Sequence, residues 1–191
     1  MNKIVKMIWF CIAINQTSLA YASLDTIIID QGQDDPVRIA VVPFKLGEEL
    51  EEQINLSEIV GFDLVRSGQF YPLPAENMLS FPSRSEAIFF RDWRILKADY
   101  LLIGSAMVSA EGKVSVSFEL YDVVNERQLE TRRFLIDRVH WRDVAHKISD
   151  IVYERITGIK GAFSTQIMYV LAKGAGTSEA TYSLQIADSD G

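Results

Sequence analysis

The sequence predicts an α/β domain, a two-layer fold in which helices flank a mixed five- or six-stranded sheet. Three observations lead to this prediction. A buried-type strand at Val37–Phe44 precedes a helical segment at Ser57–Ser67 and a later strand near Asp99, an order that allows the later strand to lie parallel beside the first. Successive strand-like runs fill residues 99–136, and their alternation indicates an antiparallel meander. A long amphipathic helix then covers His140–Thr157.

The first 22 residues have the parts of a cleavable secretory signal. Lys3 and Lys6 give a positive start, Met7–Ile14 is an apolar run, and Ala20 and Ala22 form the small-x-small pattern that signal peptidase reads. An uncleaved anchor is the alternative. A membrane span needs about 20 apolar residues, and this run is interrupted too early. We therefore predict cleavage, a periplasmic location and no membrane insertion afterwards.

Removal of the signal changes both the thiol content and the charge of the chain. Cys11 is the only cysteine, so the mature protein would have no disulfide, which is optional in exported proteins. Residues 1–22 hold two lysines and no acid, so their loss shifts the formal net charge from −7 to −9. An acidic surface repels phosphate backbones, and we predict no nucleic-acid partner.

A β-prone strip begins directly after the predicted cleavage site, and the polar stretch Asp30–Pro36 separates it from the first strand. One interpretation is an ordinary edge strand. The other is a segment that a partner protein captures by strand addition. The pattern alone leaves both open. The candidate partner-binding residues are Ser23, Leu24, Asp25, Thr26, Ile27, Ile28, Ile29 and Asp30.

The predicted first helix has a clear beginning and end. Asn55 and Glu58 have the spacing of a capping box, and Ser67-Gly68 ends the apolar periodicity. An acidic loop at Gly47–Gln53 precedes the helix, and Phe70–Pro74 follows it as a short extended piece limited by prolines. A second helix is predicted over Ser85–Lys97. One side of it would carry Ile88, Phe89, Trp93 and Leu96.

The meander consists of Asp99–Val108, Val114–Leu120 and Gln128–Ile136. In the middle run apolar residues alternate with polar ones, the period of a half-buried strand. After the long helix, Gly158 is the expected helix terminator. Two more strands are predicted at Thr165–Ala172 and Tyr182–Ala187. The final Asp-Gly is a turn signal, and we expect further strands to follow it in a longer protein.

The sequence holds few candidates for catalysis or metal binding. His140 and His146 are six positions apart on one helix and point to opposite faces, so a surface or capping role is expected for both. No nucleophile elbow, Walker loop or Rossmann fingerprint is present. Gly158–Gly161 has the form of a KH-domain loop, and residues 188–191 resemble part of a calcium loop, but each lacks its context. We predict no catalytic residue, no metal and no cofactor.

Several segments together resemble the amino-terminal domain of the TolB family, the periplasmic components of the Tol-Pal system. Their order and spacing hold over about residues 24–191, and the most specific run is Tyr153–Phe163. The matching segments are Ile28–Asp30 with Gly32, Arg38–Phe44, Ile59–Phe70, Ala98–Gly104, Phe118–Asp122 and Ile148–Ile167.

The resemblance implies four parts. They are a signal peptide at 1–22, a mobile amino-terminal strip at 23–33, the α/β domain at 34–178, and the start of a β-propeller at 179–191. In the family the mature amino-terminal segment contacts TolA, so Ser23–Gln33 is expected to bind a TolA-like inner-membrane protein. The family's propeller carries the surface for Pal. The chain ends before such a propeller, which puts binding of a Pal-like lipoprotein in doubt.

The function implied by the resemblance is a non-enzymatic periplasmic component of the Tol-Pal envelope complex. Such a component supports outer-membrane integrity, cell division and protein or colicin import through protein–protein contacts. The alternative is a stand-alone exported α/β module that binds a small ligand, or another partner, in a pocket beside the sheet.

Overall fold

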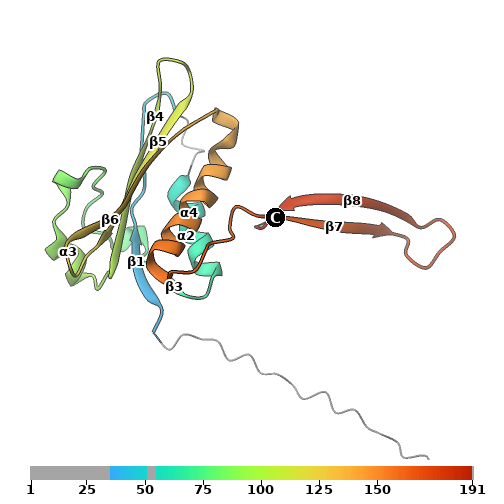
Figure 1. Ribbon diagram of the computed structural model, residues 1–191, viewed down its shortest axis with the longest axis horizontal. Helices are drawn as coiled ribbons and strands as arrows, with labels where there is room; N and C mark the ends of the chain where they lie inside the picture. Colours follow the sequence, from blue (N-terminus) through green and yellow to red (C-terminus); the bar gives the residue numbers. More distant parts are fainter. Residues whose placement is uncertain (1–34, 51–54, 191) are drawn as a thin grey trace, which may run out of the picture. The chain divides into compact units, whose positions relative to one another are not determined.

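A six-stranded mixed sheet lies at the centre of the protein (Figure 1). The computed structural model describes residues 35–50 and 55–190. The strand order is β3-β1-β4-β5-β6, and β2 pairs with β4. This confirms the predicted α/β fold with a mixed sheet. The strands are β1 Val37–Val41, β2 Lys45–Leu46, β3 Phe70–Pro72, β4 Tyr100–Val108, β5 Val114–Asp122 and β6 Arg127–Ile136.

The sheet has a parallel half and an antiparallel half. β1 runs parallel to both β3 and β4, with Ile39 opposite Tyr100 and Val37 opposite Phe70. β4, β5 and β6 form the predicted antiparallel meander. β5 alternates between buried apolar and partly exposed polar side chains along most of its length, as its sequence predicts.

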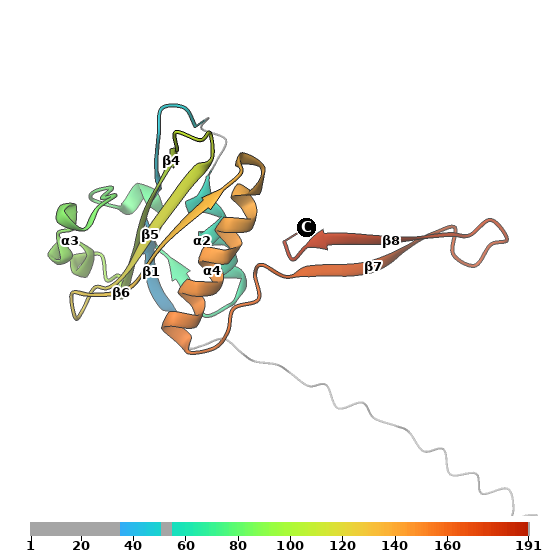
Figure 2. The same ribbon diagram turned by 45° about the horizontal axis from the view of Figure 1, so that its top comes forward.

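Two helices cover one face of the sheet, α2 (Leu56–Arg66) and α4 (Trp141–Thr157), as Figure 2 shows. The Asn55 side chain accepts a hydrogen bond from the Glu58 amide at 3.1 Å, which confirms the predicted cap of α2. Gly158 ends α4 in the left-handed conformation, with φ of 74°. The fully buried side chains between these helices and the sheet include Ile39, Leu56, Leu64, Leu102, Phe118, Leu120 and Ile148.

A smaller apolar cluster lies on the opposite face of the sheet, where α3 (Phe90–Ile95) supplies the buried Trp93. The predicted helix over Ser85–Lys97 is wrong in extent. A 3-10 turn at Ser85–Ala87 precedes α3, and Ile88 and Phe89 between them are extended. Phe89 is 67% exposed, so it does not share the buried side with Trp93. The remaining 3-10 turns are Ala75–Asn77 and Arg138–His140.

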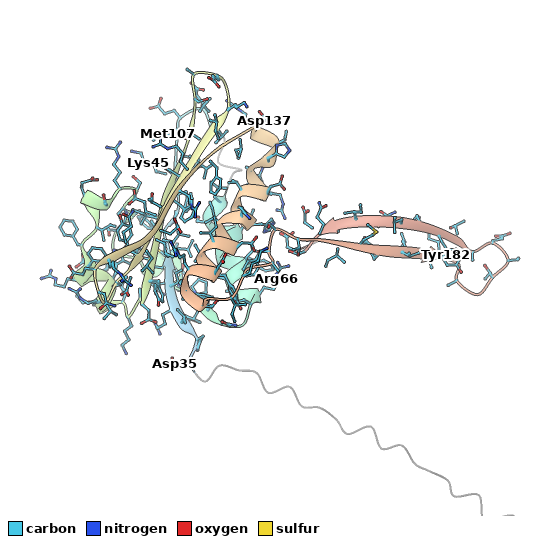
Figure 3. All side chains as sticks on the ribbon, viewed as in Figure 1. Asp35, Lys45, Arg66, Met107, Asp137 and Tyr182 are labelled. Carbon is cyan, nitrogen blue, oxygen red and sulfur yellow. The ribbon has the colours of Figure 1, made fainter. Side chains whose placement is uncertain are left out.

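The last two strands form a separate antiparallel hairpin of β7 (Gln166–Lys173) and β8 (Thr181–Asp188). Both strands were predicted, but within the described part of the chain they pair only with each other. Their side chains are exposed along nearly the whole length, as Figure 3 illustrates at Tyr182. The exposed apolar residues are Ile167, Met168, Tyr169, Val170, Leu171, Tyr182, Leu184 and Ile186.

Candidate functional site

The predicted partner-binding strip, Ser23–Asp30, and the cleavage residues Ala20 and Ala22 lie outside the described residues. Both therefore stay predictions. Within the described part of the chain, the most unusual chemistry is a polar cluster between α2, α4 and the two chain segments that flank the hairpin. We call Phe163–Ser164, before β7, the leading leg, and Ser189–Asp190, after β8, the trailing leg.

A buried carboxylate–imidazole pair forms the centre of this cluster. Asp63 lies on the apolar face of α2 between Val60 and Leu64, and it is fully buried. Its Oδ2 is 2.7 Å from Nδ1 of His146 on α4, which is 2% exposed. Arg66, one turn after Asp63, approaches the other carboxylate oxygen at 3.3 Å. The buried negative charge therefore has two partners, as a desolvated carboxylate requires.

The expectation that His146 has a surface or capping role is wrong. His146 follows Val144 and Ala145 and precedes Ile148, so it lies on the buried side of α4. Its partner Asp63 is 83 positions away in the sequence, and the pair forms only when the two helices pack. The sequence feature that could have indicated this pair is that Asp63 and His146 each interrupt the apolar face of a helix. His140 is exposed and precedes α4 without a side-chain cap bond.

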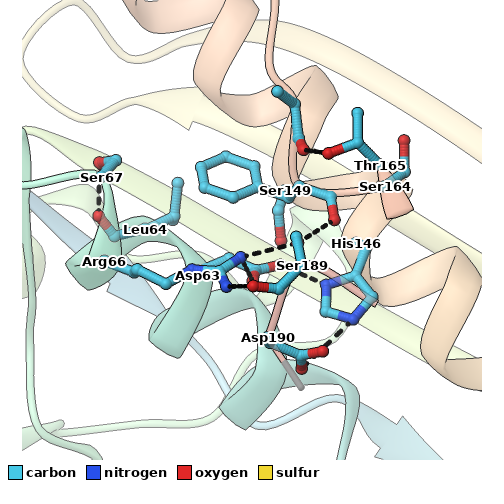
Figure 4. Close-up of polar contacts among 12 residues, drawn as sticks. Asp63, Leu64, Arg66, Ser67, His146, Ser149, Ser164, Thr165, Ser189 and Asp190 are labelled. Carbon is cyan, nitrogen blue, oxygen red and sulfur yellow. Dashed lines mark hydrogen bonds and ion pairs between the residues drawn. The ribbon is translucent and has the colours of Figure 1, made fainter. Parts of the chain in front are cut away.

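The trailing leg of the hairpin approaches the same cluster, as Figure 4 shows. Arg142 Nη2 is 2.6 Å from Asp190 Oδ2, and His146 Nε2 is 3.5 Å from the same oxygen. Arg66 donates to the Ser189 carbonyl and, at 3.0 Å, to the Ser189 hydroxyl. Three cationic or imidazole groups therefore surround a serine–aspartate segment.

The leading leg is held by a second buried carboxylate, Asp150 of α4. Asp150 Oδ1 accepts the Phe163 amide at 2.6 Å, and Oδ2 accepts both the amide and the hydroxyl of Ser164. The chain reaches this point through Gly161, where an added Cβ would lie 2.5 Å from the Asp150 Cα. The Ser189 hydroxyl donates to the Phe163 carbonyl at 2.8 Å, which joins the two legs.

The described residues offer little for cofactor chemistry. They contain no group of three or more His, Cys, Asp or Glu side chains placed to hold a metal ion. A hollow of about 210 Å³ lies beside His146 and the leading leg, and another of about 280 Å³ lies beside the ends of β1 and β3. The second is lined by Val41, Pro43, Asn55, Ser57, Glu58, Gly61, Pro72, Leu73 and Ala75.

Among the described residues, no helix is both long and apolar enough to cross a lipid bilayer.

The fold and the polar cluster together define a class of protein. It is a mixed-sheet α/β domain whose helix pair holds both legs of an exposed β-hairpin. Residues 25–129 match the model of the TolB amino-terminal domain, and the chain belongs to this family.

Relatives and a solved structure agree with this assignment. The Tol-Pal system protein TolB of Pseudomonas putida is 41% identical over 175 residues, which cover 91% of this chain and 40% of the relative. The protein of the same name from Marinomonas sp. is 38% identical over 100% of this chain and 43% of its own length. TolB from Acinetobacter baumannii superposes with a TM-score of 0.69 at 34% identity, covering 83% of this chain and 37% of that chain. The chain therefore spans about two fifths of the length of the relatives that it matches.

Proposed function

We propose that this protein is a non-enzymatic periplasmic component of a Tol-Pal envelope complex and acts through protein–protein contacts. The observation that carries this proposal is the family membership. Relatives named Tol-Pal system protein TolB align over 91–100% of the chain. A Tol-Pal component of this kind would support outer-membrane integrity, cell division and protein import.

The proposed mechanism is the capture of Ser23–Gln33 by a TolA-like inner-membrane protein. Backbone pairing would supply affinity, and the alternate side chains Ile27 and Ile29 would enter the partner's surface. The sheet topology bears on this proposal, because β1 already has β3 and β4 as its two neighbours. No further strand can pair beside β1, so the alternative of an ordinary edge strand would need the outer edge of β3 or of β6.

Deletion of residues 23–33 tests the proposal when binding to the purified TolA-like protein is measured by titration calorimetry. We expect binding to be lost while the far-UV circular dichroism and the unfolding midpoint stay unchanged. Ile27→Thr and Ile29→Thr should weaken binding more than the matched control Ile28→Thr, since only alternate side chains face one side of a strand. Unchanged affinity in the folded deletion variant would contradict the mechanism.

The periplasmic location depends on processing of the signal. The full chain, expressed in a Gram-negative host, should appear in the periplasmic fraction with Ser23 as its first residue. Edman sequencing or intact-mass measurement checks this. A product that keeps residues 1–22 and stays in the membrane fraction would overturn both the cleavage prediction and the location.

We also propose that the hairpin belongs to the β-propeller that follows this domain in the family. The predicted boundary lies between residues 178 and 179. The pairing of β7 with β8 favours a boundary before β7, near Thr165. A chain ended at residue 164 should keep the cooperative unfolding of the α/β domain if this earlier boundary is correct.

A further inference from the structure

The two legs of the hairpin are held in unequal ways. On the leading leg, Asp150 receives three hydrogen bonds, two of them from backbone amides, and it is 7% exposed. On the trailing leg, Asp190 Oδ1 has no hydrogen-bond partner among the described residues, and neither has His146 Nε2, which is 3.5 Å from Asp190 Oδ2. The trailing attachment is therefore the less completely satisfied of the two.

The groups that bind Asp190 can also be exposed to water at low cost. The Arg142 side chain is 41% exposed and that of Arg66 is 31% exposed, so both guanidinium groups already contact solvent. The Asp63–His146 pair at 2.7 Å does not include Asp190, and it can stay closed when the trailing leg leaves. Release of Asp190 therefore exposes charges to water but leaves no unpaired charge buried. A buried unpaired charge would be strongly destabilising.

The packing near the legs also indicates that the trailing leg can leave α4 at low cost. The hollow of about 210 Å³ is lined by Asp143 and His146 of α4, the leading leg, and Asp188 at the end of β8. Beside the direct contact of Asp190 with Arg142, an open space thus lies between Asp188 at the hairpin base and α4. A contact of this kind can open without the loss of a large apolar interface.

We propose that Arg142 and His146 of α4, with Arg66 of α2, form a carboxylate-binding site that holds the Ser189–Asp190 segment as a releasable latch, whereas Asp150 attaches the leading leg permanently. The ligand class is a carboxylate preceded by a hydroxyl residue, and the chain supplies this ligand itself. Opening the latch lets the hairpin turn about the leading leg. The inference does not depend on the proposed function, because it concerns only the attachment of the hairpin.

Spin-label distance measurements test the latch directly. The background is the full chain with Cys11→Ser, so that cysteines introduced at the exposed positions Glu154 and Ser178 carry the only labels. The parent should give a single narrow distance distribution between α4 and the hairpin turn. Asp190→Asn and Arg142→Gln should each remove the narrow peak. The matched control Asp188→Asn, which loses only a hydrogen bond to the Gln166 side chain, should keep it.

A double-mutant cycle separates a direct contact from general loosening. If Arg142 acts through Asp190, Arg142→Gln adds no broadening to Asp190→Asn. Circular dichroism checks that each variant is folded. Should Arg142→Gln fail to fold, Arg142→Lys is used, and it should partly preserve the narrow peak. The same distribution in Asp190→Asn and Asp188→Asn, or additive effects of Arg142→Gln and Asp190→Asn, overturns the proposal.

Discussion

The β4–β5–β6 meander and the β7–β8 hairpin are both antiparallel and rich in apolar residues, yet their apolar side chains differ in burial. In β5, Val114, Val116, Phe118 and Leu120 are at most 1% exposed beneath the helices. In the hairpin, apolar side chains are 41–66% exposed, although the same kinds of residue are present. β-prone residues favour strands in both regions, whereas the burial of their side chains depends on what packs against each strand.

The two regions also differ in what their contacts do: those of the meander stabilise the domain, and those of the hairpin legs attach the hairpin to it. Side chains between the sheet and the helices supply the apolar area removed from water, and this term dominates folding. The hairpin is joined to the helices through Asp150, Asp190 and their polar partners. Substitutions in the two regions should therefore differ in size and in kind, and four predictions test this contrast, from the largest effect to the smallest.

The largest effect is expected for Phe118→Ala. Phe118 is fully buried and stacks on Phe134 with ring centroids 6.3 Å apart. Its truncation should lower the free energy of unfolding by about 4 kcal/mol, measured by urea denaturation. Leu184→Ala in the hairpin is the control, and as an exposed position it should change stability by less than about 0.5 kcal/mol. Equal losses of unfolding free energy for Phe118→Ala and Leu184→Ala would contradict the difference in burial between the meander and the hairpin.

Asp63→Asn should rank second, because it leaves His146 and Arg66 without their buried carboxylate. We expect a loss of about 3 kcal/mol in unfolding free energy, the upper end of the cost of leaving a buried hydrogen-bonding group without its partner. Glu154→Gln on the exposed side of α4 is the charge-matched control and should stay within about 0.5 kcal/mol. A negligible effect of Asp63→Asn would mean that the polar cluster contributes no net stability.

Gly104→Ala probes the tightness of packing against the sheet. An added Cβ would lie 2.4–2.7 Å from ring atoms of the buried Phe44, so the ring or the strand must move. The expected loss is about 1–3 kcal/mol in thermal or urea unfolding. Gly61→Ala in α2, where no atom lies within 4 Å of the new Cβ, should instead stabilise by about 0.5–1 kcal/mol. The same sign for both variants would contradict the packing argument.

The smallest effect concerns pH and Glu130 on β6. Burial raises the pKa of this carboxyl, but hydrogen bonds and charges from Arg155 and Arg132 outweigh burial and leave the pKa below 4.5. A carboxyl whose pKa is lower in the folded state stabilises the fold at pH values above its unfolded-state pKa. This stabilisation is lost as the pH falls through the folded-state pKa. Glu130→Gln should therefore cost less than about 1 kcal/mol at pH 7. The difference from the parent should shrink in urea unfolding below about pH 4; a difference that grows on acidification would show the sign to be wrong.

Local signals predicted most of the fold. The alternation in β5, the Asn55 cap and the Gly158 terminator each act within a few residues, and all three are confirmed. The extent of α3 was wrong because the apolar spacing around Phe89 imitates a helical face, while the chain is extended there. β2 lies between the predicted strand at Val37–Phe44 and the predicted loop at Gly47–Gln53, and it was not predicted because it exists only through its pairing with β4.

The polar cluster could not be predicted because the contacts that join its different elements are long-range. Asp63 and His146 are 83 positions apart, and Arg142 and Asp190 are 48 apart. No spacing rule connects such residues before the helices are packed. What the sequence did contain was the unexplained presence of an acid and a histidine on apolar helix faces. The partner-binding prediction for Ser23–Asp30 lies outside the described residues and stays a prediction.

The position of β1 between β3 and β4 has a consequence for the order in which the domain can fold. Val37 pairs with Phe70, and Val41 pairs with Leu102, so the first strand of the domain finds its second neighbour about sixty residues later. A chain that emerges amino-terminus first must hold β1 without its full set of partners until β4 is available. Such long-range pairing slows folding, since loop closure comes before the contacts that offset it. The domain should therefore fold only after most of its chain is free, in one late step.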